Sequence, residues 1–203
     1  MKFPIGIQDF KKIREGGFVY VDKTALLYKL ANEGTIYFLS RPRRFGKSLL
    51  VSTLKYYFGG ERELFNGLAI DALEKDWNSY PIFHVDFNST NYTKSGDALS
   101  KLIKGTVEDW ERQYGCVGNE EFDYGKRFAE LLKHVHATTG KRCVVLVDEY
   151  DKPLLDVLDS GMVEQGGDGK EMLLEDINRE ILKGFYSAFK SADQDLRFVL
   201  LTG

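Results

Sequence analysis

Short apolar runs recur along this chain and predict four buried strands. Each run is short, apolar and rich in β-branched or aromatic residues, a pattern typical of strands inside a sheet. The predicted strands are Ile36–Ser40, Ile82–Phe87, Arg142–Val147 and Leu196–Leu201. The segments between them are longer and have a different periodicity.

Helical periodicity dominates these longer segments. After Gly46, apolar residues recur every three or four positions until Gly59 and Gly60, which predicts a helix of about three turns. Further helices are predicted at Thr24–Asn32, Gly96–Tyr114, Phe122–Val135 and Met172–Ala192. The last of these should bury a single stripe made of Leu173, Ile177, Ile181, Phe185 and Phe189.

Strands that alternate with helices favour a mainly parallel sheet with helices on both faces, because βαβ crossovers are right-handed. The predicted fold class is therefore a three-layer α/β/α protein. Residues 35–203 form its core, and residues 1–34, which lack a clear strand, form an N-terminal extension packed on it. The glycine-rich segment Ser160–Lys170 is predicted to be a mobile loop between two helices.

The last predicted strand ends just before Gly203, with no helix after it to cover its face. We therefore expect a C-terminally truncated core that lacks its final strand and lid. The net charge of −3 gives no general attraction for nucleic acid. The longest apolar run, Cys143–Val147, is far shorter than the ~20 residues of a membrane span, and no secretory segment opens the chain, so a cytoplasmic location is expected.

One loop between a strand and a helix has the composition of a phosphate-binding site. The strand Ile36–Ser40 runs into R-P-R-R-F-G-K-S, and a helix follows at once. In the pattern G-x-x-x-x-G-K-[ST], backbone N–H groups and the helix N-terminus hold phosphate oxygens. Lys47 would reach the terminal phosphates, and the hydroxyl of Ser48 would bind Mg²⁺.

The pattern is incomplete, because Arg41 occupies the position of the first glycine. A basic turn with an incidental G-K-S sequence is the alternative interpretation. Neighbouring arginines favour phosphate binding, since guanidinium groups pair well with phosphate. The candidate nucleotide-binding residues are Arg41, Arg43, Arg44, Phe45, Gly46, Lys47, Ser48 and Leu49.

A second candidate motif follows the strand Arg142–Val147, which ends in Asp148 and Glu149. In nucleotide hydrolases an acid here holds the metal and a second acid polarises the attacking water. Asp148 is therefore a candidate metal ligand beside Ser48, and Glu149 a candidate catalytic residue beside Lys47. Many parallel strands end in an acid without such a role, but both motifs in the correct order favour nucleotide binding.

Thr202 follows the last predicted strand and is a third candidate catalytic residue, as a polar sensor near the γ-phosphate. A simple strand-ending turn residue explains it equally well. The three histidines, His84, His134 and His136, form no recognisable metal-binding pattern. A nuclease site at Asp86, Asp148 and Glu149 fits poorly, because Lys47 is already explained by the phosphate loop.

Three segments together resemble the bacterial AAA-ATPase-like family. They are the N-terminal F-P-I-G through Y-V-D-K-T, the R-P-R-R-F-G-K-S loop and the string D-E-Y-D-K-P that begins at Asp148. The resemblance covers essentially the whole chain and implies that Arg41 is the family's own variant. It also implies an ASCE-type P-loop NTPase sheet, in which the strand leading to Thr202 lies between the strands that precede Lys47 and Asp148.

The same resemblance implies a PD-(D/E)XK nuclease-like domain after this one, through which alone nucleic acid would be bound. Val21–Thr24 would shape the rim of the nucleotide site, with Phe18 or Tyr20 near the base, although packing on the core is an alternative. The leading hypothesis is thus a Mg²⁺-dependent ATPase that drives an attached domain. The rival is a non-hydrolysing nucleotide-binding module, and neither the preference for ATP over GTP nor the oligomeric state follows from the sequence.

Overall fold

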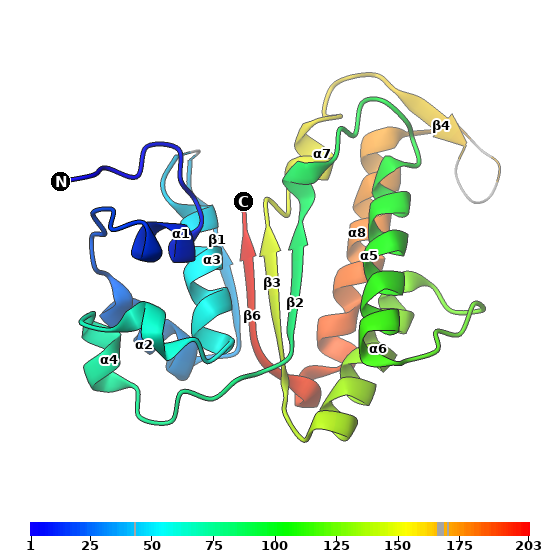
Figure 1. The fold of residues 1–203 in the computed structure, drawn as a ribbon. Coiled ribbons are helices and arrows are strands. Elements are labelled where there is room, and N and C mark those ends of the chain that lie inside the picture. The colour runs from blue at the N-terminus through cyan, green and yellow to red at the C-terminus, as the bar shows by residue number, and fades with distance from the viewer. Residues whose placement is uncertain (43, 166–168, 170) are drawn as a thin grey trace. The chain divides into compact units, whose positions relative to one another are not determined.

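The computed structural model describes residues 1–42, 44–165, 169 and 171–203. Figure 1 shows its elements in chain order: α1 (Phe10–Glu15), α2 (Thr24–Glu33), β1 (Ile36–Leu39), α3 (Lys47–Phe58), α4 (Ala69–Leu73), β2 (Ile82–Asp86), α5 (Ala98–Tyr114), α6 (Tyr124–Thr139), β3 (Cys143–Asp148), α7 (Lys152–Leu155), β4 (Val163–Gln165), β5 (Glu171–Leu173), α8 (Leu174–Ser191) and β6 (Leu196–Thr202). Short 3₁₀ helices lie at Arg62–Phe65, Phe87–Ser89 and Asp193–Asp195.

Four strands form one sheet in the order β1-β6-β3-β2. β1 pairs in parallel with β6, so that Ile36 lies opposite Val199 and Leu39 opposite Thr202. All residues of β3 are buried, which explains why it reads as a continuous apolar run. The four predicted strands are confirmed to within one residue at each end, and the α/β class with a mainly parallel sheet is confirmed with them. The prediction that all four are buried was wrong for β1, where Phe38 is 68% exposed.

Contacts divide the chain into two compact units. The first contains Met1–His84, Arg142–Asp148 and Arg197–Gly203, and the second contains Val85–Lys141 and Glu149–Leu196. The residues predicted as an N-terminal extension belong to the first unit, together with β1 and α3. One crossing point between the units falls between Asp148 and Glu149.

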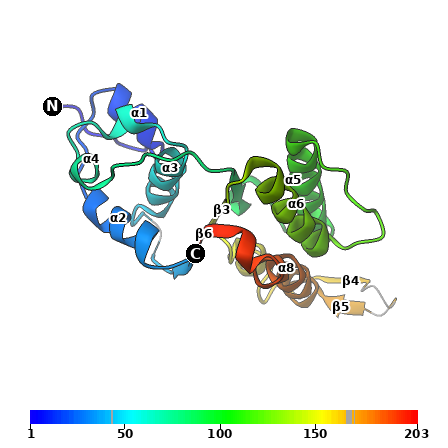
Figure 2. The same cartoon turned by 90° about the horizontal axis from the view of Figure 1, so that it is seen from below.

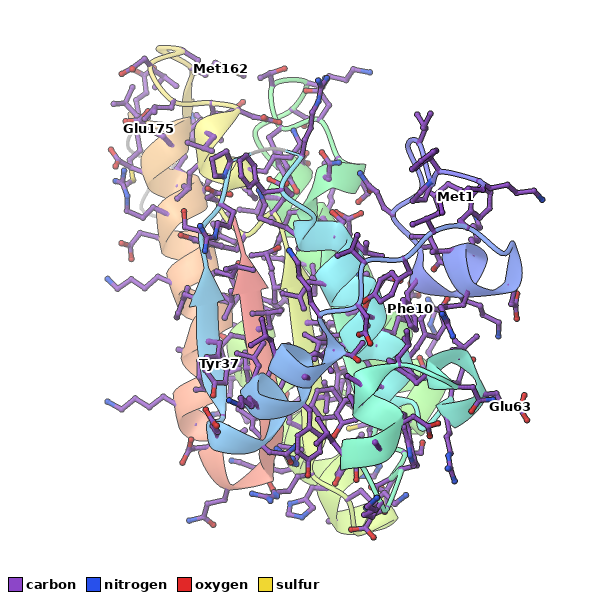
Figure 3. The ribbon with its side chains drawn as sticks, turned by 90° about the vertical axis from the view of Figure 1, so that its left-hand side faces the viewer. Met1, Phe10, Tyr37, Glu63, Met162 and Glu175 are labelled. Atoms are coloured by element: carbon purple, nitrogen blue, oxygen red, sulfur yellow. The ribbon has the colours of Figure 1, made fainter. Side chains whose placement is uncertain are left out.

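The core of the first unit is aromatic and includes a short helix that periodicity did not predict. α1 begins at Asp9, whose carboxylate accepts the N–H of Lys12 at 2.8 Å. Phe10, labelled in Figure 3, is fully buried, and its N–H donates to Ser52 Oγ of α3 at 2.9 Å. A six-residue helix is too short to be recognised by its period, so only these contacts with α3 reveal it.

In the second unit, α5, α6 and α8 pack side by side (Figure 2). The ring of Phe128 on α6 stacks between Trp110 of α5 and Phe185 of α8, each with its centroid 5.1 Å away. Glu111 and Arg127 form a buried ion pair between α5 and α6, with Arg127 Nε 3.0 Å from Glu111 Oε1. These contacts make the three helices one packed layer.

Two predictions in this unit were wrong in part. The segment Ser160–Lys170 is not simply a loop, because Val163–Gln165 forms β4 and pairs antiparallel with β5; residues 166–168 and 170 lie outside the described part. Helix α8 begins at Leu174, whereas Leu173 belongs to β5. Its buried face carries Leu174, Asn178, Leu182 and Phe185, so the predicted stripe is displaced by one residue over its first turns. Polar Asn178 on that face interrupted the apolar pattern.

None of the described helices is both long and apolar enough to cross a bilayer.

Candidate functional site

The loop between β1 and α3 contains two residues with a left-handed backbone. Arg44 and Gly46 have left-handed φ angles of 69° and 78°, and α3 begins directly afterwards at Lys47. A Cβ added to Gly46 would meet open space, so the glycine is required by its φ and not by crowding. Successive right- and left-handed residues before a helix N-terminus are typical of anion-binding loops.

Lys47 is buried, at 6% exposed, and its side chain folds back across this loop. Its Nζ donates a hydrogen bond to the carbonyl oxygen of Arg41 at 2.7 Å. A backbone carbonyl is available from any residue type, so this contact does not need glycine at the first position of the motif. The structure thereby explains how Arg41 is compatible with the loop.

The loop is tied to the end of β6 by backbone hydrogen bonds. The N–H of Arg41 donates to Gly203 O at 2.9 Å, and the N–H of Gly203 donates to Leu39 O at 3.1 Å. The ladder between β1 and β6 therefore continues into the start of the loop. This pairing fixes where the loop leaves the sheet.

Asp148 and Thr202 lie at the ends of the neighbouring strands β3 and β6, and they touch. The hydroxyl of Thr202 donates to Asp148 Oδ1 at 2.5 Å, and the two residues are 0% and 6% exposed. Since β6 lies between β1 and β3, the ends of three adjacent strands carry the loop, Thr202 and Asp148. The expected intervening strand between the two motifs is thus confirmed.

Glu149 is the first residue of the second unit and adopts an uncommon backbone conformation. Its φ is 55°, in the left-handed region that non-glycine residues rarely occupy. Its carbonyl oxygen accepts the N–H of Lys152 at 3.1 Å, which closes a turn into α7. Strained backbone of this kind is concentrated at functional sites.

The remaining candidates differ in their surroundings. Arg44 and Phe45 are exposed, Ser48 and Leu49 are partly buried in the first turn of α3, and Arg43 lies outside the described residues. Asp86 accepts the N–H of Asn88 at 2.8 Å and so caps a 3₁₀ turn. Across the described ranges, no three His, Cys, Asp or Glu side chains gather as a metal site.

The V-D-K-T segment has a clear structural role that the sequence did not reveal. Asp22 accepts hydrogen bonds from the N–H and hydroxyl of Thr24 and from the N–H of Ala69, at 2.7–2.8 Å. The hydroxyl of fully buried Thr24 also accepts the N–H of Ile70 at 3.1 Å. One carboxylate and one hydroxyl therefore cap both α2 and α4, whose partnership could not be inferred before α4 was known.

Burial alone would raise the pKa of Asp22. The hydrogen bonds from Thr24 and Ala69 outweigh it and hold the pKa of this carboxyl below its usual range. Asp22 thus remains a charged acceptor under ordinary conditions.

Beside the loop, the first unit contains a cavity of about 700 Å³ with mostly apolar walls. The phosphate-loop residues Arg41, Phe45 and Gly46 form part of its wall, and no Asp or Glu is among its lining residues within the described chain. The N-terminal residues up to α2, helices α2 and α3, and the end of β1 supply the rest: Phe3, Pro4, Ile13, Val19, Tyr20, Val21, Lys23, Leu26, Leu27, Leu30, Leu39, Leu49, Leu50 and Thr53.

Of the two aromatic residues predicted near a base, Tyr20 lines this cavity and Phe18 does not. Burial raises the pKa of Tyr20, so its hydroxyl stays protonated at neutral pH. A cavity of this size is in the range that holds a small organic ligand.

The fold and site define an α/β protein with a basic loop, ending in Gly46, between the strand β1 and the helix α3. A family model described as "Predicted AAA-ATPase" matches residues 4–203, so the chain belongs to the AAA-ATPase-like family. This membership supports a nucleotide-binding, ATPase-like role.

A protein of Azotobacter chroococcum mcd 1, described as "Uncharacterized protein in vnfD 5'region", is 40% identical over 208 residues, and the match covers all of this chain. The chain spans only 37% of that relative's length. No solved structure matches the chain significantly.

Proposed function

We propose that this chain is the core of a P-loop NTPase of the three-layer ASCE type, which binds Mg²⁺ and ATP and hydrolyses the nucleotide. The observation that carries the proposal is the meeting of three features at adjacent strand ends: the loop that ends in Lys47, the hydroxyl of Thr202 and the carboxylate of Asp148. Ligands of open α/β sheets bind outside the carboxyl ends of the strands.

The loop and the N-terminus of α3 hold the phosphates. Lys47 exchanges its contact with Arg41 O for a phosphate oxygen, which is a stronger, charge-assisted partner than a neutral carbonyl. Arg41, Arg43 and Arg44 add positive charge around the loop, while Phe45 and Leu49 enclose the nucleotide beside it. The helix dipole favours the same negative charge.

Ser48 and Asp148 are the residues that would hold Mg²⁺. They offer a hydroxyl and a carboxylate, the oxygen donors that this ion prefers, and Mg²⁺ commonly takes one or two protein ligands and completes its shell with phosphates and water. The absence of a larger acidic cluster in the described chain therefore fits. When bound, the ion neutralises charge on the phosphate oxygens. Thr202 orients the Asp148 carboxylate and can sense the γ-phosphate.

Glu149 polarises the attacking water. It follows Asp148 directly, and its left-handed φ sets it apart from an ordinary strand-ending acid. The backbone strain is the specific reason to favour hydrolysis over binding alone.

The apolar cavity holds the adenosine portion of the nucleotide. It shares Arg41, Phe45 and Gly46 with the phosphate loop, so a ligand in the loop extends naturally into it. Guanine presents N–H donors that a carboxylate would recognise, and the described lining residues include no carboxylate. We therefore propose ATP in preference to GTP.

The alternative is a nucleotide-binding module that does not hydrolyse. Within a longer protein of the relative's kind, either form would couple nucleotide state to an attached domain, which we expect to be nuclease-like. Phosphate release measured on the full-length protein and on this chain tests hydrolysis, and calorimetric titration with ATP and Mg²⁺ tests binding. Binding without turnover supports the module, and no binding of any nucleotide rejects both forms.

A further inference from the structure

Helix α8 carries a polar residue on its buried face. Leu174, Asn178, Leu182 and Phe185 follow the spacing of one helical face, and all four are buried. Asn178 is only 1% exposed, at a position where the spacing favours an apolar residue. Burying a side-chain amide costs free energy unless the amide is hydrogen-bonded.

The partner of this amide lies in α7, the four-residue helix that follows the Glu149 turn. The N–H of Asp156 bonds to Lys152 O, and that of Val157 bonds to Leu154 O. Both N–H groups that a helix could offer to Pro153 O are thus used elsewhere. Asn178 Nδ2 donates to Pro153 O at 2.8 Å in their place.

The orientation of this amide is defined by its partner. A flipped side chain would place the amide oxygen against the carbonyl oxygen of Pro153, so the nitrogen must face it. Asn178 Oδ1 is enclosed without a partner among the described atoms. Only one half of the amide is used, and that half binds α7.

A second hydrogen bond lies just beyond α7, where the N–H of Asp159 donates to Glu175 Oε2 of α8 at 3.2 Å. Asp151 Oδ1 and Tyr186 Oη are also buried without partners among the described residues of the second unit. Burial raises the pKa of Tyr186 strongly, and the nearby Tyr150, Tyr92 and Asp151 raise it further. The bond from Asn178 to Pro153 joins a residue of α7 itself to the buried face of α8.

This bond reaches Glu149 through the backbone. Pro153 follows Lys152, whose N–H closes the turn onto Glu149 O at 3.1 Å. The strained φ of Glu149 persists only if the surrounding structure holds it. We propose that Asn178 is a positioning residue, which fixes the turn from Glu149 to α7 and thereby sets the direction of the Glu149 carboxylate.

The inference rests on the proposed hydrolysis, but its first test does not. Asn178→Leu keeps the number and branching of the side-chain heavy atoms and removes the donor, and Leu182→Ala, one turn further along the same buried face, serves as the matched control. Hydrogen exchange at the amides of residues 152–156 should become at least about tenfold faster in Asn178→Leu than in Leu182→Ala at equal global stability. Equal exchange in the two variants would overturn the inference.

The second test separates positioning from packing. In the full-length protein, Asn178→Leu should lower kcat by about tenfold or more, as misplaced catalytic groups do, with ATP affinity within about twofold of wild type. Leu182→Ala should leave kcat near wild type once both are measured well below their Tm. An equal loss of kcat in both variants would overturn the positioning role. If the wild type shows no turnover, the proposed hydrolysis fails, while the exchange experiment still decides whether Asn178 holds the turn.

Discussion

The hydroxyl of Thr202 donates a hydrogen bond to Asp148 Oδ1, and both residues are buried at the ends of adjacent strands. This contact joins two residues that lie far apart in sequence. The contact orients the Asp148 carboxylate from a neighbouring strand, so the two side chains form a hydrogen-bonded pair at the carboxyl ends of the two central strands.

Replacing Thr202 by valine should therefore affect both stability and metal-dependent binding. Valine has nearly the same shape but no hydroxyl, so Asp148 loses a partner, at a cost of about 1–3 kcal/mol in the free energy of unfolding. The affinity for ATP should fall more in the presence of Mg²⁺ than in EDTA. Urea titration and calorimetry measure the two effects. Thr138→Val, which removes a hydroxyl bonded within its own helix, is the control and should leave binding unchanged.

Lys47→Ala should weaken ATP binding by at least tenfold, or about 1.4 kcal/mol, because it removes the charged side chain that we propose binds the terminal phosphates. Equilibrium dialysis or calorimetry measures the change. The matched control is Lys55→Ala, which removes an exposed lysine from the last turn of the same helix. If the two variants bind ATP alike, the loop is not the phosphate site.

Glu149→Gln should preserve ATP binding and lower phosphate release by about 100-fold or more, the range expected when a general base is lost. The amide is nearly isosteric with the carboxylate but cannot accept the proton of water. Malachite-green phosphate detection measures the rate. A variant as active as wild type would remove Glu149 from the proposed chemistry and favour the non-hydrolysing alternative.

Leu49→Trp should distinguish the base from the phosphates. The larger ring projects into the apolar cavity, so the affinity for ATP should fall at least about tenfold, while inorganic tripolyphosphate, which has no base, should bind as before. Competition titration of the two ligands measures both affinities. An unchanged affinity for ATP would mean that adenosine lies elsewhere.

Acid should destabilise the first unit through Asp9 and Asp22. Burial opposes ionisation of both carboxyls, but hydrogen bonds hold the pKa of each below its usual range. Asp9 accepts them from Lys12 and Tyr56, and Asp22 accepts them from Thr24 and Ala69. A carboxyl with a lower pKa in the folded state stabilises the fold above its unfolded pKa, about 3.9, and loses that contribution as pH falls through the folded value.

Chemical denaturation at pH 6 and pH 3 should therefore show that the free energy of unfolding falls less with acid in the double variant Asp9→Asn, Asp22→Asn than in wild type. Asp193→Asn, in the second unit, is the control and should keep the wild-type pH dependence. A double variant that loses as much stability as wild type would exclude these two carboxylates as the cause.

The periodicity of the sequence was sufficient for the long elements. The strands β1, β2, β3 and β6 were predicted because each is a short apolar run, although only β3 and β6 are buried along almost their whole length, and α3 was predicted because two glycines end it. The short helices α1, α4 and α7 were not predicted, since four to six residues are too few to establish a period. The stripe of α8 was misplaced because Asn178 occupies a core position.

The residue types likewise indicated the candidate loop and the acids at the end of β3. A glycine followed by a lysine, or an acid that ends a strand, can be recognised in the sequence whatever the tertiary structure. The sequence therefore determined which residues are candidates for binding phosphate and metal, and in which elements they lie. Only the tertiary structure decided their partners. Thr202 meets Asp148, Asp22 caps α4 and Asn178 reaches Pro153, because hydrogen bonds between residues distant along the chain depend on which strands and helices become neighbours in space.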